Sequence, residues 1–180
     1  MKKLMKWVLA GVLGIIVLVA AATGIGALLP RDHVASSAIT LRQAPDSVWH
    51  VVRDFAGQPF WWKDVRGVVR LPDVGGRERW RQEYTSGPMA LEIVEDQPPR
   101  RLVTRIVPSD NAASYGGTWT FEVAATDGQS QVTVTEEGWV ANPLLRLVAR
   151  TMLGPHTTMD SYLTALGRRF GQEVEPGHLR

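Results

Sequence analysis

Hydrophobic and polar positions divide the chain into one long apolar run and a following series of shorter patterns. The run covers residues 7–29, which carry no charge, and three lysines stand ahead of it. As a helix rising about 1.5 Å per residue it would be about 34 Å long, enough to cross a hydrocarbon core of about 30 Å. The pattern therefore predicts a membrane anchor at residues 1–30 and a folded domain at residues 31–180.

The charges beside the apolar run indicate its orientation. Three lysines precede it, whereas Arg31 and Asp32 follow it with opposite signs, so we expect a cytoplasmic N-terminus and a domain on the opposite side of the membrane. A cleaved secretory signal is the alternative, because a basic start, an apolar stretch and the alanines at 20–22 resemble one. The run continues past these alanines, which favours an uncleaved anchor. Both alternatives export the domain.

After the anchor, alternating apolar and polar residues predict an antiparallel sheet. The first strand ends before Pro45, which can begin a helix through Phe55. A second short helix or loop follows it, and Asp127 with Gly128 forms the turn of the clearest hairpin. The predicted strands lie at residues 34–42, 65–71, 77–84, 89–95, 101–107, 118–123 and 132–135.

A helical pattern closes the chain. Asn142 can cap free amides and Pro143 can occupy the first helical position. Gly154 and Pro155 interrupt the pattern, so we expect a kink or a break there. The seam at spacings of three and four runs through Leu145, Val148, Met152, His156, Met159, Leu163, Leu166 and Phe170.

Charge and composition exclude several functions. The chain has 20 Lys and Arg against 18 Asp and Glu, and without the three N-terminal lysines the domain has 17 against 18. A near-neutral domain lacks the basic surface that neutralises phosphates, so we predict no nucleic-acid partner. The absence of cysteine rules out disulfides, thiolate metal sites and a cysteine nucleophile.

The order of one strand, two short helices, about six further strands and a long C-terminal helix resembles the START-like, or SRPBCC, superfamily. The resemblance covers about residues 34–171. It is carried by Ala-Pro-Asp-Ser-Val-Trp at 44–49, Gly-Thr-Trp-Thr-Phe at 117–121, Thr-Glu-Glu-Gly-Trp at 135–139 and Tyr-Leu-Thr-Ala-Leu at 162–166. More narrowly, the chain is similar to bacterial members with an N-terminal membrane helix, which implies a periplasmic or external domain. The implied α+β helix-grip fold is a curved antiparallel sheet of about six or seven strands wrapped around the C-terminal helix.

The resemblance also implies an apolar cavity between sheet and helix that holds lipids, sterols, polyketides or other hydrophobic molecules. Large side chains on the inward strand faces and on the helix seam would line such a cavity, although the same side chains would suit a packed core. The expected lining residues are Trp80, Tyr84, Leu91, Ile93, Trp119, Phe121, Val134, Glu136, Met152, His156, Met159 and Leu163.

Glu136 and His156 are the candidate catalytic residues. Glu136 continues the inward phase of Val134, and a buried carboxylate needs a partner. His156 lies on the helix seam, so Glu136 could contact His156, or else Arg105 or Tyr84, and a pair formed with His156 could transfer protons. Alternatively, Glu136 turns outward near Gly138 and His156 is an ordinary core residue. The sequence has no His-x-x-x-His spacing, serine-nucleophile elbow or phosphate loop, so we predict no metal and no cofactor.

We therefore expect a membrane-tethered domain that binds a hydrophobic small molecule or lipid. Two alternatives stay open, because one fold hosts several functions: a cyclase- or hydratase-type enzyme acting in the cavity, and a scaffold with a filled core that binds a partner. An empty apolar cavity would favour binding. Paired titratable groups inside it would favour catalysis, and an exposed apolar patch over a filled core would favour interaction.

Overall fold

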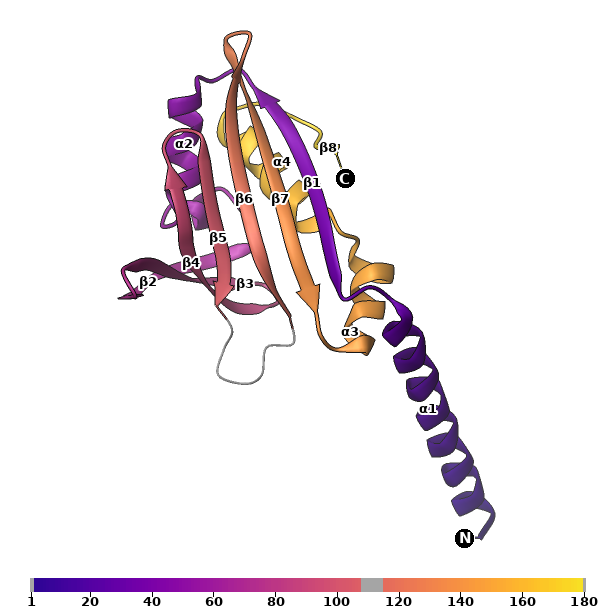
Figure 1. Ribbon diagram of the computed structural model, residues 1–180. Helices are drawn as coiled ribbons and strands as arrows, with labels where there is room; N and C mark the ends of the chain where they lie inside the picture. The colour runs from indigo at the N-terminus through magenta and orange to yellow at the C-terminus, as the bar shows by residue number, and fades with distance from the viewer. Residues whose placement is uncertain (1, 108–114, 180) are drawn as a thin grey trace.

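The computed structural model of the protein describes residues 2–107 and 115–179, and shows a helix extending away from a curved sheet that curls around a C-terminal helix (Figure 1). The extended helix, α1 (Lys2–Leu28), coincides with the apolar run. Its segment Met5–Leu28 is long and apolar enough to cross a membrane, and its most apolar stretch is not buried against the rest of the protein. An apolar helix without a protein cover is suited to lipid surroundings.

The described strands form one antiparallel sheet in the order β2-β3-β4-β5-β6-β7-β1-β8. Neighbours from β2 to β7 are consecutive in the chain, and β1 lies beside β7 (Figure 1). Asp127 and Gly128, with φ of 46° and 77°, form the two-residue turn between β6 and β7. The strands are β1 (Asp32–Leu41), β2 (Val65–Val74), β3 (Arg77–Tyr84), β4 (Gly87–Gln97), β5 (Arg101–Val107), β6 (Tyr115–Thr126), β7 (Gln129–Val140) and β8 (Gly177–His178).

Helices connect β1 to β2 and follow β7. The predicted helix from Pro45 is present but ends at Arg53, and a short 3₁₀ helix follows it. The Asn142 side chain caps the helix after β7 by accepting hydrogen bonds from the amides of Leu144 and Leu145 at 2.9 and 3.2 Å. The helices after α1 are α2 (Pro45–Arg53), η1 (Gln58–Phe60), α3 (Pro143–Val148), η2 (Ala149–Leu153) and α4 (Thr157–Arg169).

The hydrophobic core lies between the sheet and α4, and α2 closes one side of it. The buried apolar residues of α4 recur at spacings of three and four, so they lie on one face of the helix, which packs against the sheet. Sheet residues at alternate positions meet that face. This arrangement confirms the predicted α+β helix-grip fold. Fully buried members of the core include Leu41, Val48, Leu102, Val132, Val134, Met159, Leu163 and Leu166.

The single long C-terminal helix predicted by the seam is divided in two, as Gly154 and Pro155 led us to expect. Gly154 has φ of 72°, a conformation that interrupts the helix between η2 and α4. The interruption turns α3 away from the core, so Leu145 and Val148 are exposed although the seam predicted them to be buried. The side chain of Met152 lies outside the described part of the chain.

Instead of the core, α3 contacts the end of α1 (Figure 1). The helices approach closely at Gly26, where any side chain would collide with the backbone of Pro143. Arg146 strengthens this junction because its guanidinium donates hydrogen bonds to the carbonyl oxygens of Leu29, at 2.8 Å, and Ala141, at 3.1 Å. The domain is therefore attached to α1 by packing as well as by the chain.

Candidate ligand pocket

A pocket lies between the sheet and α4. Its volume is about 40 Å³, and about 430 Å³ when all the empty space around it, open solvent included, is counted. We call its five buried apolar and aromatic side chains the floor and its four half-buried ones the mouth, and three buried polar residues complete the lining. The floor is Phe55, Trp62, Leu91, Phe121 and Tyr162, the mouth is Tyr84, Met89, Ile106 and Trp119, and the polar residues are Gln58, Gln82 and Thr104.

The enclosed space is small because aromatic rings fill most of it. Tyr162 on α4 lies edge-on to Trp62, with ring centroids 5.1 Å apart, and its centroid is 5.4 Å from that of Phe121. Trp119 tilts over Phe121 at 5.8 Å. A space of 40 Å³ accommodates only a few water molecules. The large empty apolar cavity that would favour binding is therefore not seen among the described residues, and a larger ligand requires the half-buried side chains of the mouth to rotate.

A short chain of hydrogen bonds orders the polar side of the pocket. The Tyr84 hydroxyl donates to Gln82 Oε1 at 3.1 Å, and Gln82 Nε2 donates to Gln58 Oε1. Both glutamines are buried, which fits the rule that buried amides are hydrogen-bonded. Burial raises the pKa of Tyr84, and the nearby charges of Asp64 and Glu136 raise it further. At neutral pH this phenol is therefore a neutral hydrogen-bond donor.

Tyr162 carries a hydroxyl that has no partner among the described residues. The residue is 1% exposed and lines the pocket, and its hydroxyl oxygen is buried without a hydrogen bond. Burial also raises the pKa of Tyr162, so the group stays protonated. A buried hydroxyl in this state costs about 1–3 kcal/mol unless something binds it.

Glu136 does not contact His156, the partner that the sequence suggested. Its Oε1 is 2.9 Å from His33 Nε2, and its Oε2 accepts a hydrogen bond from Trp119 Nε1 at 2.7 Å. The carboxylate therefore lies behind the indole of the pocket mouth, with its side chain 26% exposed. The hydrogen bond with Glu136 raises the pKa of His33, opposed in part by burial of the imidazole.

His156 lies outside the pocket. Because the helix breaks at Gly154, His156 immediately precedes α4 instead of continuing its buried seam. Its Nδ1 is 3.1 Å from Ser37 Oγ on β1, and its ring stacks on that of His178 at 3.9 Å. A catalytic pair formed by Glu136 and His156 is therefore not present in this structure.

The remaining predicted lining residues divide into two groups. Tyr84, Leu91, Trp119 and Phe121 line the pocket. The others are buried or half-buried in the core without lining the pocket, so they support its walls. They are Trp80, Ile93, Val134, Met159 and Leu163.

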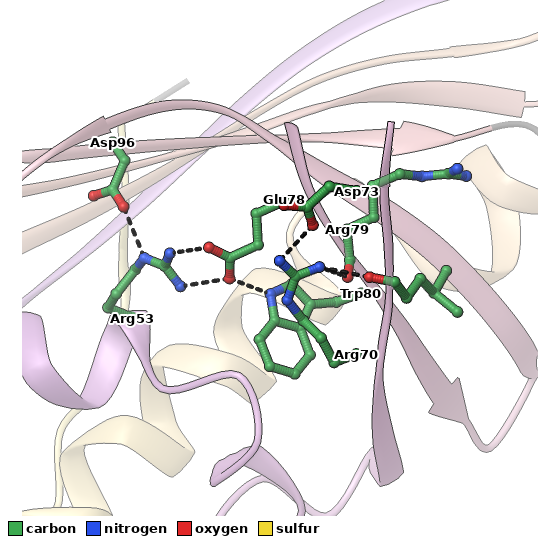
Figure 2. Close-up of polar contacts among 8 residues, drawn as sticks. Arg53, Arg70, Asp73, Glu78, Arg79, Trp80 and Asp96 are labelled. Carbon is green, nitrogen blue, oxygen red and sulfur yellow. Dashed lines mark hydrogen bonds and ion pairs between the residues drawn. The ribbon is translucent and has the colours of Figure 1, made fainter. Parts of the chain in front are cut away.

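Trp80 belongs to a polar network that holds α2 against β3 and β4 (Figure 2). Arg53, at the end of α2, forms two hydrogen bonds with the Glu78 carboxylate, and its Nε donates to Asp96 Oδ2 at 2.8 Å. Glu78 Oε1 also accepts from Trp80 Nε1 at 2.6 Å. The Trp80 ring stacks on Phe55 at 5.7 Å, so the network fixes one residue of the pocket floor.

Several lining residues were not predicted from the sequence, although the position of Tyr162 on a helical pattern indicated that it is buried. It lies three positions after Met159 and four before Leu166, on the buried face of α4. Gln82 on β3 and Thr104 on β5 gave no such signal, because a polar residue at an inward strand position interrupts the apolar alternation. Gln58 lies on the short helix η1, where no alternation exists. The lining residues not predicted from the sequence are Phe55, Gln58, Gln82, Met89, Thr104, Ile106 and Tyr162.

A curved antiparallel sheet closed over a C-terminal helix, with a pocket between them, defines the helix-grip class of START-like proteins. The sequence model of the family described as polyketide cyclase/dehydrase and lipid transport matches residues 32–170. The chain belongs to this family.

Solved structures share this fold at low sequence identity. The Zhui aromatase/cyclase from Streptomyces sp. R1128 is 15% identical, with a TM-score of 0.59 over 77% of this chain and 93% of that chain. A START superfamily protein from Mycobacterium smegmatis is 16% identical, with a TM-score of 0.59 over 76% and 96%. A hypothetical protein from Helicobacter pylori is 12% identical, with a TM-score of 0.65 over 77% and 88%. Comparison with curated protein sequences gives no match.

Proposed function

We propose that the protein binds a hydrophobic small molecule or lipid in this pocket. The observation that carries the proposal is the unpartnered, buried hydroxyl of Tyr162, a residue that lines the pocket. A ligand with a carbonyl, ether or hydroxyl oxygen would accept its hydrogen bond and remove the cost of burying it. The rings around it would meanwhile bury the apolar part of the ligand.

The composition of the pocket supports binding more than catalysis. Apolar and aromatic side chains dominate the lining, with a few polar groups to orient a ligand, as in most small-molecule sites. The described lining residues include no carboxylate and no imidazole, so none of them is an obvious general base. An enzyme of the cyclase type would have only neutral donors here, chiefly Tyr84 and Tyr162.

The proposed ligand enters from an adjacent bilayer. In this proposal residues 1–30 anchor the chain, with a cytoplasmic N-terminus and residues 31–180 outside. The packing of α3 on the end of α1 supports it, because exposed Leu144, Leu145 and Val148 then lie where the anchor leaves the membrane. Such side chains suit the membrane interface. The tether keeps the pocket near a high local concentration of lipid.

Photolabelling tests the proposal directly. The full chain is placed in nanodiscs that contain a photoactivatable fatty acid, irradiated, and mapped by peptide mass spectrometry. We expect labels on peptides that contain the mouth residues Met89, Ile106 or Trp119 as well as on α1. Met89→Trp narrows the mouth and should abolish the pocket labels, whereas Val69→Trp, at an exposed position of β2, should not. Labels confined to α1 would contradict the proposal.

A further inference from the structure

A second cluster of polar side chains lies where β1, the start of α4 and the C-terminal segment meet. The Ser37 hydroxyl is 3.1 Å from His156 Nδ1 and donates to Asp160 Oδ1 at 2.9 Å. His178 Nε2 is 2.8 Å from Asp160 Oδ2. Two imidazoles and one carboxylate thus offer ligand atoms that all lie within 4.8 Å of one another. None of these residues lines the pocket.

The fold brings the cluster together from distant parts of the chain. His156 and Asp160 are four residues apart at the start of α4, so they lie on the same side of it. His178 arrives because the C-terminal segment returns to the sheet as β8, where it is opposite Ser37. The Leu179 amide then donates to the Ser36 carbonyl oxygen at 2.9 Å. Since β8 has only two residues, side-chain contacts matter for holding this end.

The donor set matches a particular class of cation. Imidazole nitrogens combined with one carboxylate oxygen suit Zn²⁺ and similar divalent transition metals, whereas Ca²⁺ and Mg²⁺ prefer oxygen ligands alone. Ser37 already positions the Asp160 carboxylate by a hydrogen bond, as outer-shell groups commonly do for metal ligands.

The geometry needs an adjustment of the side chains to reach a metal centre. Zn²⁺ binds nitrogen and oxygen at about 2.0–2.2 Å, which places tetrahedral ligand atoms about 3.4 Å apart. Ligand atoms that now lie up to 4.8 Å apart must therefore approach by up to about 1.4 Å. The side chains of His178 and Asp160 are 51% and 31% exposed and have room to move. The imidazoles of His156 and His178 are stacked with an interplanar angle of 9°, so one ring, that of the more exposed His178, must rotate before both can bind the same ion.

Although the sequence predicted no metal, we propose from this geometry that His156, Asp160 and His178 bind one Zn²⁺ or a similar divalent transition metal ion. The ion joins the C-terminal segment to the start of α4 and, through Ser37, to β1. Because α4 also carries Tyr162 of the pocket floor, the site fixes the end of the helix that closes the pocket. The proposal does not depend on what the pocket binds.

Isothermal titration with Zn²⁺ tests this site on the full chain in detergent, purified without a histidine tag and treated with a chelator. We expect one saturable site per chain, with affinity lowered about tenfold or more by His156→Ala, by Asp160→Asn and by His178→Ala. His50→Ala, which removes an exposed imidazole on α2, is the matched control and should bind as the wild type does.

Thermal unfolding gives the second measurement. Zn²⁺ should raise the Tm of the wild type and of His50→Ala but not of His178→Ala, because ligands that bind the folded state stabilise it. His178 lies on a two-residue edge strand, so its replacement leaves the core intact. No saturable binding by the wild type, or equal binding by all variants, would show that the cluster is held by hydrogen bonds alone and would overturn the proposal.

Discussion

Replacing Tyr162 by phenylalanine should stabilise the protein without ligand and weaken its binding of ligand. The hydroxyl is fully buried and has no hydrogen-bond partner among the described residues. Its removal relieves a desolvation cost of about 1–3 kcal/mol and leaves the ring contacts with Trp62 and Phe121 in place. In a domain of this size 1 kcal/mol corresponds to about 2–4 °C in Tm.

Tyr84→Phe is the matched control, because the Tyr84 hydroxyl does have a partner. It donates to Gln82 Oε1 at 3.1 Å, and Gln82 is buried. Removing this hydrogen bond leaves a buried amide oxygen without a donor and should cost about 1 kcal/mol. The two variants therefore delete the same atom type from the same pocket with opposite effects on Tm.

The assay is thermal unfolding of the full chain in detergent, monitored by near-ultraviolet circular dichroism, with and without an added long-chain fatty acid. We expect Tyr162→Phe to raise the Tm of the free protein by a few degrees and to weaken fatty-acid binding by about 2–10-fold, the value of one neutral hydrogen bond. A decrease in Tm as large as that of Tyr84→Phe would refute the reasoning, since it would mean that the hydroxyl is already satisfied.

Three further predictions concern the surroundings of the pocket. Gly26→Leu should shift and broaden the distribution of distances between one spin label on α1 and one on the sheet, because Gly26 touches α3. Gly24→Leu is the control and should leave the distribution unchanged, because Gly24 has open space around it. Equal behaviour of the two variants would disprove the α1–α3 contact. The pKa of His33 is raised by Glu136, so their pair stabilises the fold below pH 6.5, and the stability falls as pH rises through the folded pKa. The Tm of the wild type should fall between pH 6 and pH 9, by an amount that corresponds to about 0.5 kcal/mol in the free energy of unfolding. The Tm of His33→Gln should not show this fall. Arg53→Met should lower the free energy of unfolding, measured with urea at pH 7, by about 1–2 kcal/mol. Arg53 lowers the pKa of the Glu78 carboxyl from 4.5, so the difference in the free energy of unfolding between variant and wild type should shrink below pH 4.5. A difference that stays constant with pH would exclude the ion pair.

Much of the fold was predictable because it depends on periodicity. Alternating residues located the strands from β2 to β7, and Asp127 with Gly128 located the turn between the two longest. Pro45 and Asn142 indicated where helices begin. These signals are local, so they can be read without knowing which segments meet.

The site was less predictable because its contacts join distant segments. Glu136 was expected to face inward, but the sequence could not show that His33, more than 100 residues earlier, would bind it. The C-terminal segment has no apolar pattern that predicts its return to β1, so His178 could not be placed beside His156. Tyr162 had the correct helical spacing, but only the packed structure shows that its hydroxyl lacks a partner.

The measurement that tests the central claim most directly is mass spectrometry of the small molecules that the full chain retains when purified gently from membranes. We predict one hydrophobic molecule per chain, released on denaturation and lost in Met89→Trp, which narrows the mouth of the pocket, but kept in Val69→Trp. Equal recovery from both variants would assign the molecule to the surface of α1. Recovery of no molecule from the wild type would likewise contradict the claim that the pocket binds a hydrophobic ligand.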